Sequence, residues 1–318
     1  MKHKKTLWKI AAVSLCLLVI VLGLVFLNTW EWQDSTDELP AADAENEFWN
    51  GSLETILFMG LDKYQAPEDV AGYFNDQQSD FMMVLIIDRD SKTCDLLHLN
   101  RDTMTEIQRL GIGGGVAGTF TGQLALAHTY GSGGSDSCIN AKHAVSELLG
   151  GVCIDHYVTV TMDAVSILND MAGGVTLEIM DDFSEINPDL VQGTTVTLTG
   201  EQALQYIRSR SGLQDSTNLH RMERQRQYVS QLLKNIQEKS KEDANFLEQA
   251  VGEISPYMQT DYSIYQLTEL GDELKDFSLN PIVSIPGEAI KGAGFMEFYP
   301  DQDALKEIVE ELFHTQQD

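Results

Sequence analysis

The chain has 318 residues and a hydrophobic fraction of 43%, which is enough to build a sizeable core and excludes a disordered chain. Its 21 basic and 49 acidic residues give a net charge of −28, which argues against a broad face that binds nucleic acid or an anionic membrane surface. The cysteines show neither a Cys-x-x-Cys pair nor zinc-type spacing, so the sequence gives no support for a metal–thiolate site.

An apolar segment near the N-terminus predicts a membrane anchor. Residues 10–27 carry no charge and have about the length of a spanning helix. Lysines precede this segment, and Trp30 and Trp32 follow it, as the positive-inside rule and an interfacial aromatic belt require. A cleaved signal peptide is the alternative, but no A-x-A-like site follows. We expect residues 1–9 in the cytoplasm, a single-pass anchor in the cell membrane at 10–30, and the remainder outside the cell.

Three apolar runs follow an acidic stretch at residues 31–53, which is typical of a juxtamembrane linker. The runs are TILFMGLD (55–62), DFMMVLIID (80–88) and TCDLLHLNRDT (93–103). Strands that are apolar on nearly every residue indicate a sheet covered on both faces. Residues 107–122 are rich in glycine and are expected to form a flexible loop. This loop is not a phosphate cradle, because no Lys-Ser/Thr pair follows it.

The second half of the chain alternates between helical and strand patterns, which is typical of an α/β domain. Thr199 and Gln202 form a capping-box signature for a short helix, and Asn218 is a good N-cap for the next one. We predict one domain over 54–318 with these elements: helix 137–149, strand 153–162, helix 164–173, strand 174–179, helix 199–207, a helix from 218, strand 281–287 and helix 304–313.

Five of the eight arginines lie within QYIRSRSGLQDSTNLHRMERQRQ (205–227). One interpretation is a solvated helix face, and the other is a site for a polyanion. Arg208 and Arg210 face the same way only if the backbone between them is extended.

The next helix places three polar side chains on one side of its first two turns, near an N-terminus that favours anions. These are Arg221, Arg224 and Gln225. Guanidinium groups bind phosphate oxygens in pairs, so the pattern predicts a phosphate site. Arg226 lies on a different side and is expected to be an ordinary solvated residue.

Acidic residues lie where the same strands end. Asp62 ends one predicted strand and Asp80 begins the next, so both are expected at one rim of the sheet, and Arg101 directly follows a third strand. Two carboxylates at a phosphate site repel the phosphate unless a divalent cation lies between them. Mg²⁺, which is usually held by one or two carboxylates and phosphate oxygens, is the expected cofactor.

The cysteines outside the apolar segment leave two interpretations open. Cys16 lies in the predicted anchor, which leaves Cys94, Cys138 and Cys153. These three are buried free thiols, or Cys138 and Cys153 form one disulfide, which spacing alone does not establish.

Several motifs in the same order resemble those of the LytR-CpsA-Psr cell-envelope proteins, and the resemblance covers nearly the whole chain. They are TILFMGLD, SDFMMVLIID, HLNRDT, LTGEQALQYIRSR and RMERQRQ. The resemblance implies a membrane-anchored phosphotransferase that moves a glycopolymer, of the teichoic acid or capsular polysaccharide type, from a polyprenyl-pyrophosphate carrier to peptidoglycan. We therefore expect a single extracellular α-β-α layered domain with a central mixed sheet.

The resemblance also assigns roles to individual residues. Asp62 and Asp80 hold Mg²⁺, and the polyprenyl tail occupies an apolar tunnel between the sheet and its helices. Asp80, Arg101 and Asp102 are the expected catalytic residues, although Asp102 is equally suited to be a structural partner of a neighbouring arginine. The pyrophosphate-binding residues are Arg101, Arg208, Arg210, Arg221, Arg224 and Gln225.

Three positions depart from the family pattern. Gln78 stands where the family usually has arginine, Asn218 where it usually has aspartate, and His220 where it usually has glycine. We expect catalysis to be retained. A polyprenyl-pyrophosphate hydrolase is the alternative enzyme, and a non-catalytic lipid-binding envelope protein, which Gln78 and Asn218 favour, is the alternative of another class.

Overall fold

A computed structural model describes residues 53–62, 78–111, 113–210 and 217–313. The described residues belong to one compact unit, which spans Trp49–Asp318. The predicted anchor at 10–30 and nearly all of the predicted linker lie outside the described residues. Within the described ranges, no helix has the length and apolar character needed to cross a membrane.

A central sheet of seven strands runs in the order β10-β3-β2-β1-β6-β9, with β11 also paired to β3. β1 is antiparallel to β2 and parallel to β6, so the sheet is mixed, as predicted. Its strands are β1 (Leu53–Leu61), β2 (Ser79–Asp88), β3 (Thr93–Leu99), β6 (His156–Val160), β9 (Met258–Thr260), β10 (Ser278–Leu279) and β11 (Val283–Ser284).

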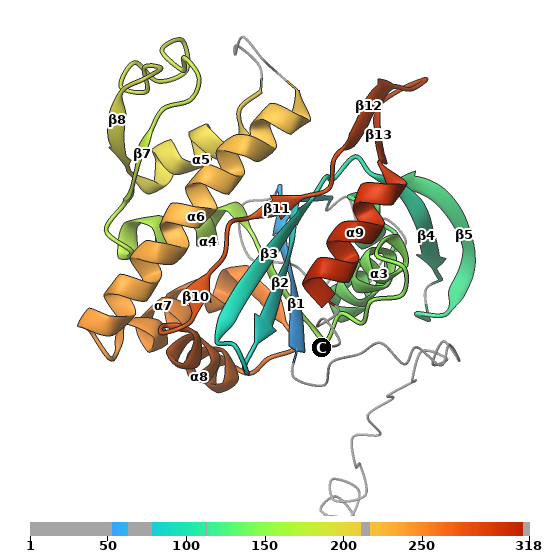
Figure 1. Cartoon of the computed structure of the whole chain (residues 1–318), viewed down its shortest axis with the longest axis horizontal. Coiled ribbons are helices and arrows are strands. Elements are labelled where there is room, and N and C mark those ends of the chain that lie inside the picture. The colour runs from blue at the N-terminus through green and yellow to red at the C-terminus, as the bar shows by residue number, and fades with distance from the viewer. Residues whose placement is uncertain (1–52, 63–77, 112, 211–216, 314–318) are drawn as a thin grey trace, which may run out of the picture. The chain divides into compact units, whose positions relative to one another are not determined.

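Helices lie on both sides of this sheet (Figure 1). They are α2 (Leu126–Thr129), α3 (Gly134–Leu148), α4 (Met162–Met171), α5 (Gly200–Arg208), α6 (Asn218–Glu242), α7 (Phe246–Ile254), α8 (Ile264–Leu274) and α9 (Gln302–Phe313), with a 3₁₀ turn at Ser255–Tyr257. The three two-stranded sheets are β4 (Met104–Leu110) with β5 (Val116–Gln123), β7 (Val175–Glu178) with β8 (Thr195–Leu198), and β12 (Gly287–Lys291) with β13 (Met296–Pro300).

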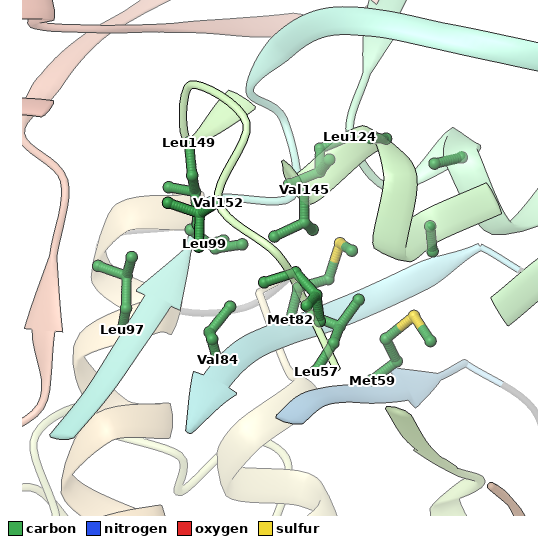
Figure 2. Packing of buried hydrophobic residues seen from close by; sticks show 14 of the residues in the cluster. Leu57, Met59, Met82, Val84, Leu97, Leu99, Leu124, Val145, Leu149 and Val152 are labelled. Carbon is green, nitrogen blue, oxygen red and sulfur yellow. The ribbon is translucent and has the colours of Figure 1, made fainter. Parts of the chain in front are cut away.

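The apolar strands pack on both faces, which explains why they lack a polar alternation. Leu57 and Met59 of β1 belong to a cluster that includes residues of α3 and α9, and Figure 2 shows them in this cluster together with Met82 and Val145. Ile56, the residue before Leu57, belongs to a second cluster, against which Leu270 and other residues of α8 pack. Because successive side chains of a strand point to opposite faces, this division produces the predicted α-β-α layers.

The glycine-rich segment at 107–122 is not a flexible loop, and this prediction was wrong. It forms most of the β4–β5 hairpin, in which Ile107 pairs with Phe120. Ile107 is fully buried, and burial of a side chain of this size contributes about 1.5–3 kcal/mol. The glycines make the reversal: Gly111 N donates to Gly115 O, and Gly114 adopts a φ of 75°. The high glycine content therefore did not reveal the two strands β4 and β5 of this segment.

The N-terminal caps of α5 and α6, the two helices that carry the clustered arginines, agree only in part with the prediction. The capping box of Thr199 and Gln202 is confirmed at the start of α5. For α6 the N-cap is Thr217, whose Oγ1 accepts from His220 N at 3.3 Å. Asn218 is thus the first helical residue and not the cap, which leaves its amide for contacts with other segments.

All three described cysteines are free thiols, so a Cys138–Cys153 disulfide is not present. Cys138 is buried, lies 3.4 Å from Thr159 Oγ1, and burial raises its pKa to about 12. Cys94 is also buried, whereas Cys153 is exposed, so the interpretation of three buried thiols holds for two of them.

Candidate active site

Three strand ends meet at one rim of the central sheet. β1 and β2 are antiparallel with Leu61 opposite Ser79, so the residue after β1 and the residues at the start of β2 are neighbours. β3 is antiparallel to β2 with Leu99 opposite Met82, which brings the segment after β3 to the same rim. The register therefore places Asp62, Asp80 and Arg101 together, as the sequence predicted.

Each predicted metal ligand pairs with a guanidinium group. Asp80 Oδ1 accepts from Arg101 Nη1, and Asp80 Oδ2 lies 3.7 Å from Arg221 Nη1. Asp62 Oδ1 accepts from Arg208 Nη2. Arginines from the end of β3, the end of α5 and the start of α6 thus converge on two carboxylates, although these segments are far apart in the sequence.

Asp102 lies beside this rim but is held more tightly than Asp80. Its Oδ1 accepts from Gln123 Nε2 at 2.7 Å and lies 3.4 Å from Arg101 Nε. Its backbone N–H donates to Asn100 Oδ1 at 3.0 Å. Burial raises the pKa of Asp102, against the opposing effect of Arg101. These contacts favour the interpretation of Asp102 as a structural partner of the neighbouring arginine.

The end of α5 presents two arginines on one side, as predicted. Arg208 is its last residue, and Ser209 adopts an extended conformation with φ −62° and ψ 136°. Side chains two residues apart on extended backbone point the same way. Arg210 is exposed, and its charge contributes to lowering the pKa values of Arg101 and Arg221. Its charge therefore acts on both of these guanidinium groups.

Positive charges crowd one another at this rim. Arg221 is 4% exposed, and its Nε makes no hydrogen bond among the described residues. Burial, followed by the charges of Arg210 and Arg101, lowers the pKa of Arg221 to about 9, so it stays charged at neutral pH. A buried cation next to other cations gains stability from an added anion. The rim is therefore electrostatically suited to bind an anionic group.

Arg224 and Gln225 make their contacts elsewhere. Arg224 is fully buried, donates to Tyr206 O and Ser209 O at 2.6 Å each, and has its Nε 3.1 Å from Asp181 Oδ2. Gln225 Nε2 donates to a carbonyl oxygen in the same turn, that of Ile207, at 3.3 Å. Carbonyl groups in the last turn of a helix have no partner within the helix. Both side chains therefore fix the end of α5, and these contacts join neither of them to Asp62 or Asp80.

Five contacts around the site were not predicted from the sequence. Asp181 Oδ1 lies 2.7 Å from His220 Nε2 and ties the start of α6 to the segment after β7. Asn218 Nδ2 donates to Asn100 Oδ1 at 2.7 Å, while its Oδ1 accepts from Arg221 Nη2 at 2.6 Å. Gln123 Nε2 supplies the last two, because it bridges Asp102 to Met296 O. No local pattern marks these polar residues, because their partners come from distant segments.

Arg226 is not an ordinary solvated residue, which corrects the sequence prediction. It is partly buried, and burial lowers its pKa. Its charge, together with that of Arg221, adds to the effect of burial on His98 of β3, whose pKa falls to about 3. Arg226 is therefore partly buried and close enough to β3 for its charge to act on His98.

The carboxylates at the rim fit a magnesium ion. Among the described residues, no group of three or more His, Cys, Asp and Glu side chains forms a metal site by itself. Mg²⁺, however, usually takes only one or two carboxylates and completes its shell with phosphate oxygens and water. Asp62 and Asp80 supply this donor set beside arginines that suit a phosphate group.

Comparison with known proteins supports one family. The chain is 30% identical over 261 residues to the polyisoprenyl-teichoic acid–peptidoglycan teichoic acid transferase TagU of Halalkalibacterium halodurans, covering 81% of this chain and 77% of TagU. The fold matches protein gbs0355 of Streptococcus agalactiae, with a TM-score of 0.67, 21% identity, and coverage of 84% of this chain and 90% of that one.

It also matches the Bacillus subtilis protein TagT bound to LI-WTA, with a TM-score of 0.61, 20% identity, and coverage of 82% of this chain and 90% of that one. These two structural likenesses establish the fold. The sequence model of the LytR_cpsA_psr family matches residues 31–314, and the chain belongs to this family.

Proposed function

We propose that the chain is a transferase that moves a glycopolymer from a polyprenyl-pyrophosphate carrier to peptidoglycan. The observation that carries this proposal is the convergence of Arg101, Arg208, Arg210 and Arg221 on one rim of a chain whose net charge is −28. The name of TagU, a teichoic acid transferase, and the LI-WTA bound by TagT support the same substrate class.

The arginines bind and orient the pyrophosphate. When the substrate enters, its phosphate oxygens take over the guanidinium groups that now pair with Asp62 and Asp80. The four arginines then offset the charge that develops on the bridging oxygen as it leaves. Released from the arginines, Asp62 and Asp80 would hold Mg²⁺, which when bound neutralises phosphate charge and polarises the transferred group.

The acceptor hydroxyl loses its proton to a carboxylate at the rim. The hydroxyl oxygen forms a bond to the phosphorus that carries the glycopolymer, and the bond from this phosphorus to the bridging oxygen breaks. Polyprenyl phosphate leaves. We assign the proton to Asp80 Oδ2, because Asp102 is held between Gln123 and Arg101.

The polyprenyl tail requires an apolar path, and the sheet face under α6 and α8 offers one. Phe58 and Phe81 from the sheet, Leu233 from α6 and Leu270 from α8 are only partly buried, although they pack against a buried cluster. Phe81 directly follows Asp80, so this apolar face begins at the rim that binds the pyrophosphate.

We further propose that residues 10–30 anchor the chain in the cell membrane with the N-terminus in the cytoplasm. The uncharged apolar segment and the lysines before it support this orientation. Protease added to intact cells with a permeable wall should degrade the folded part and leave an N-terminal fragment in the membrane. Protection of the folded part until the cells are lysed would contradict the proposed orientation.

The test of the function is glycopolymer attachment to peptidoglycan by the full chain in detergent, with and without EDTA. Asp80→Ala should abolish attachment while the arginines still bind the lipid pyrophosphate. Asp90→Ala, which removes an exposed carboxylate in the turn after β2, is the matched control and should keep activity.

The products separate the alternatives. Release of glycopolymer phosphate into solution, with no glycopolymer attached to peptidoglycan, would indicate the hydrolase. Undiminished attachment by Asp80→Ala, or in EDTA, would refute the metal mechanism. A passive lipid-binding protein would give neither product, although it would bind the lipid pyrophosphate.

A further inference from the structure

The β12–β13 hairpin carries an outer face of exposed apolar and acidic side chains. Glu288 pairs with Tyr299 and Ile290 pairs with Glu297, and directly opposed residues of two strands share a face. Phe295 lies in the bend directly before β13, two residues before Glu297, and its backbone O accepts from Gly292 N at 2.9 Å. We call these five residues the hairpin face. Ile290, Phe295 and Tyr299 are 42%, 48% and 45% exposed, which is high for large apolar side chains.

The hairpin is fixed to the segment that bears Asp102. Phe298 N donates to Asp102 O at 2.9 Å, and the Phe298 side chain is 1% exposed. Gln123 Nε2 donates both to Met296 O at 2.8 Å and to Asp102 Oδ1 at 2.7 Å. Thr103 and Phe298 also form a parallel bridge. The hairpin therefore extends rigidly from the active-site rim, at the end of the sheet where α6 begins (Figure 1).

The chemistry of the hairpin face decides which partner fits it. Its two carboxylates, Glu288 and Glu297, repel anionic lipid headgroups and polyanionic glycopolymers. Tyr299 Oη donates to Glu297 Oε2 at 2.7 Å, so an aromatic ring and a carboxylate lie side by side. Lys291 alternates to the opposite face and does not neutralise them.

A sugar ring matches this combination. Its C–H face is apolar and packs on an aromatic ring, while its hydroxyl groups donate to carboxylate oxygens, which accept only. From Tyr299 to Phe295, in the bend before β13, the chain covers four residue steps, up to about 13 Å at strand spacing, which is longer than one sugar ring. The face therefore suits a chain of sugars that leads to Asp80 and Asp102.

We propose that the hairpin face binds the uncharged sugar chain of the peptidoglycan acceptor and directs its hydroxyl group to the rim. This inference rests on the proposed function and adds the acceptor site to it. The donor pyrophosphate is bound by the arginines, so donor and acceptor occupy different surfaces. Changes in the hairpin face consequently affect the acceptor and leave the donor unaffected.

The first experiment measures transfer to peptidoglycan glycan strands by the full chain in detergent. Phe295→Ala and Tyr299→Ala should each raise the KM for glycan strands about tenfold, with the KM for the lipid-linked donor unchanged. Tyr265→Ala, which truncates an exposed tyrosine of α8, is the matched control and should behave as wild type. An unchanged acceptor KM in both hairpin variants would overturn the acceptor site and leave the proposed function standing.

A second experiment does not depend on turnover. Wild type and Tyr265→Ala should sediment with purified peptidoglycan sacculi, and Phe295→Ala and Tyr299→Ala should sediment less. Equal sedimentation of all variants would overturn the inference, whether or not transfer is detected. Absence of transfer in the wild type would instead count against the proposed function.

A third arm tests a bilayer as the occupant. The full chain bearing Phe295→Trp, compared with its parent in nanodiscs of doxyl-labelled lipid, should show no additional quenching at the new tryptophan. Quenching there would place the hairpin in the lipid and overturn the inference.

Discussion

Replacement of Arg224 by methionine should unfold the end of α5, whereas the same replacement of Arg221 should impair binding. The two arginines lie one helical turn apart on α6, and both are nearly fully buried. Arg224 donates to Tyr206 O and Ser209 O and pairs with Asp181. Arg221 lies among other cations: burial, followed by the charges of Arg210 and Arg101, lowers its pKa.

The magnitude follows from the groups left without partners. Removing Arg224 breaks its ion pair with the buried Asp181, which then keeps only His220 as a partner on α6. It also removes the donor that Arg224 supplies to two carbonyl groups, those of Tyr206 and Ser209. Breaking a buried pair in this way costs about 3–5 kcal/mol. At roughly 2–4 °C per kcal/mol for a domain of this size, the melting temperature should fall by roughly 10 °C. Arg221→Met removes a crowded charge, so its melting temperature should stay close to that of wild type.

The assay compares thermal unfolding of the full-length variants in one detergent at a fixed scan rate, followed by titration with polyprenyl pyrophosphate at a temperature where both are folded. Arg221→Met should lose affinity by 1.5–3 kcal/mol, about 10- to 150-fold, the usual range for a charge-assisted contact. A stable Arg224→Met variant with the affinity loss of Arg221→Met would refute the assignment and place Arg224 in the binding site, as the sequence suggested.

Three further outcomes are expected. His98 has a folded-state pKa below its unfolded value, so its stabilising contribution is present above pH 6.5 and is lost as pH falls; between pH 7.5 and pH 5 wild type should lose about 2 kcal/mol more than His98→Gln in urea unfolding. Arg226→Ala should change pyrophosphate affinity little, whereas Arg208→Ala should lower it about tenfold or more. Asn218→Asp cannot donate to Asn100 and attracts Arg221, so lipid pyrophosphate titration should show weaker binding; tighter binding would contradict this reasoning.

The site at the rim of the sheet could be predicted from the sequence, because local patterns of apolar and polar residues indicate where strands end. β1, β2 and β3 are apolar runs bounded by polar residues, and consecutive strands usually pair, so Asp62, Asp80 and Arg101 could be placed at one edge. For Arg208 and Arg210, spacing set only a condition, that they face the same way if the backbone between them is extended, and Ser209 meets this condition. Each of these inferences needed only the geometry of one element or one strand pair.

The errors arose where tertiary contacts decide the outcome. Spacing places Arg224 on the same side of α6 as Arg221. The guanidinium of Arg224, however, donates its hydrogen bonds to two carbonyl groups at the end of α5. Glycine content suggested a loop at 107–122, whereas pairing of Ile107 with Phe120 and burial of Ile107 stabilise a hairpin. The periodicity of one helix or strand does not predict these partners, the carbonyl groups of α5 and the side chain of Phe120, because they come from other parts of the chain.

The departures from the family pattern form a balanced set in the structure. Gln78, in place of the usual arginine, removes one positive charge, and its Oε1 accepts from Arg101 Nη2 at 2.8 Å. Asn218, in place of the usual aspartate, removes one negative charge, and its Nδ2 donates to Asn100 Oδ1. One cation and one anion are lost together, so the net charge that meets a pyrophosphate is unchanged.

This compensation bears on whether the site is active. A neutral Asn218 orients Arg221 through its Oδ1 without the charge of an anion that would compete with phosphate for the guanidinium. Gln78 likewise holds Arg101 at the rim without the repulsion that a second arginine would add there. The substitutions therefore conserve the two features on which transfer depends, the positive rim and the placement of Asp80, and they argue for a working transferase over a passive lipid-binding protein.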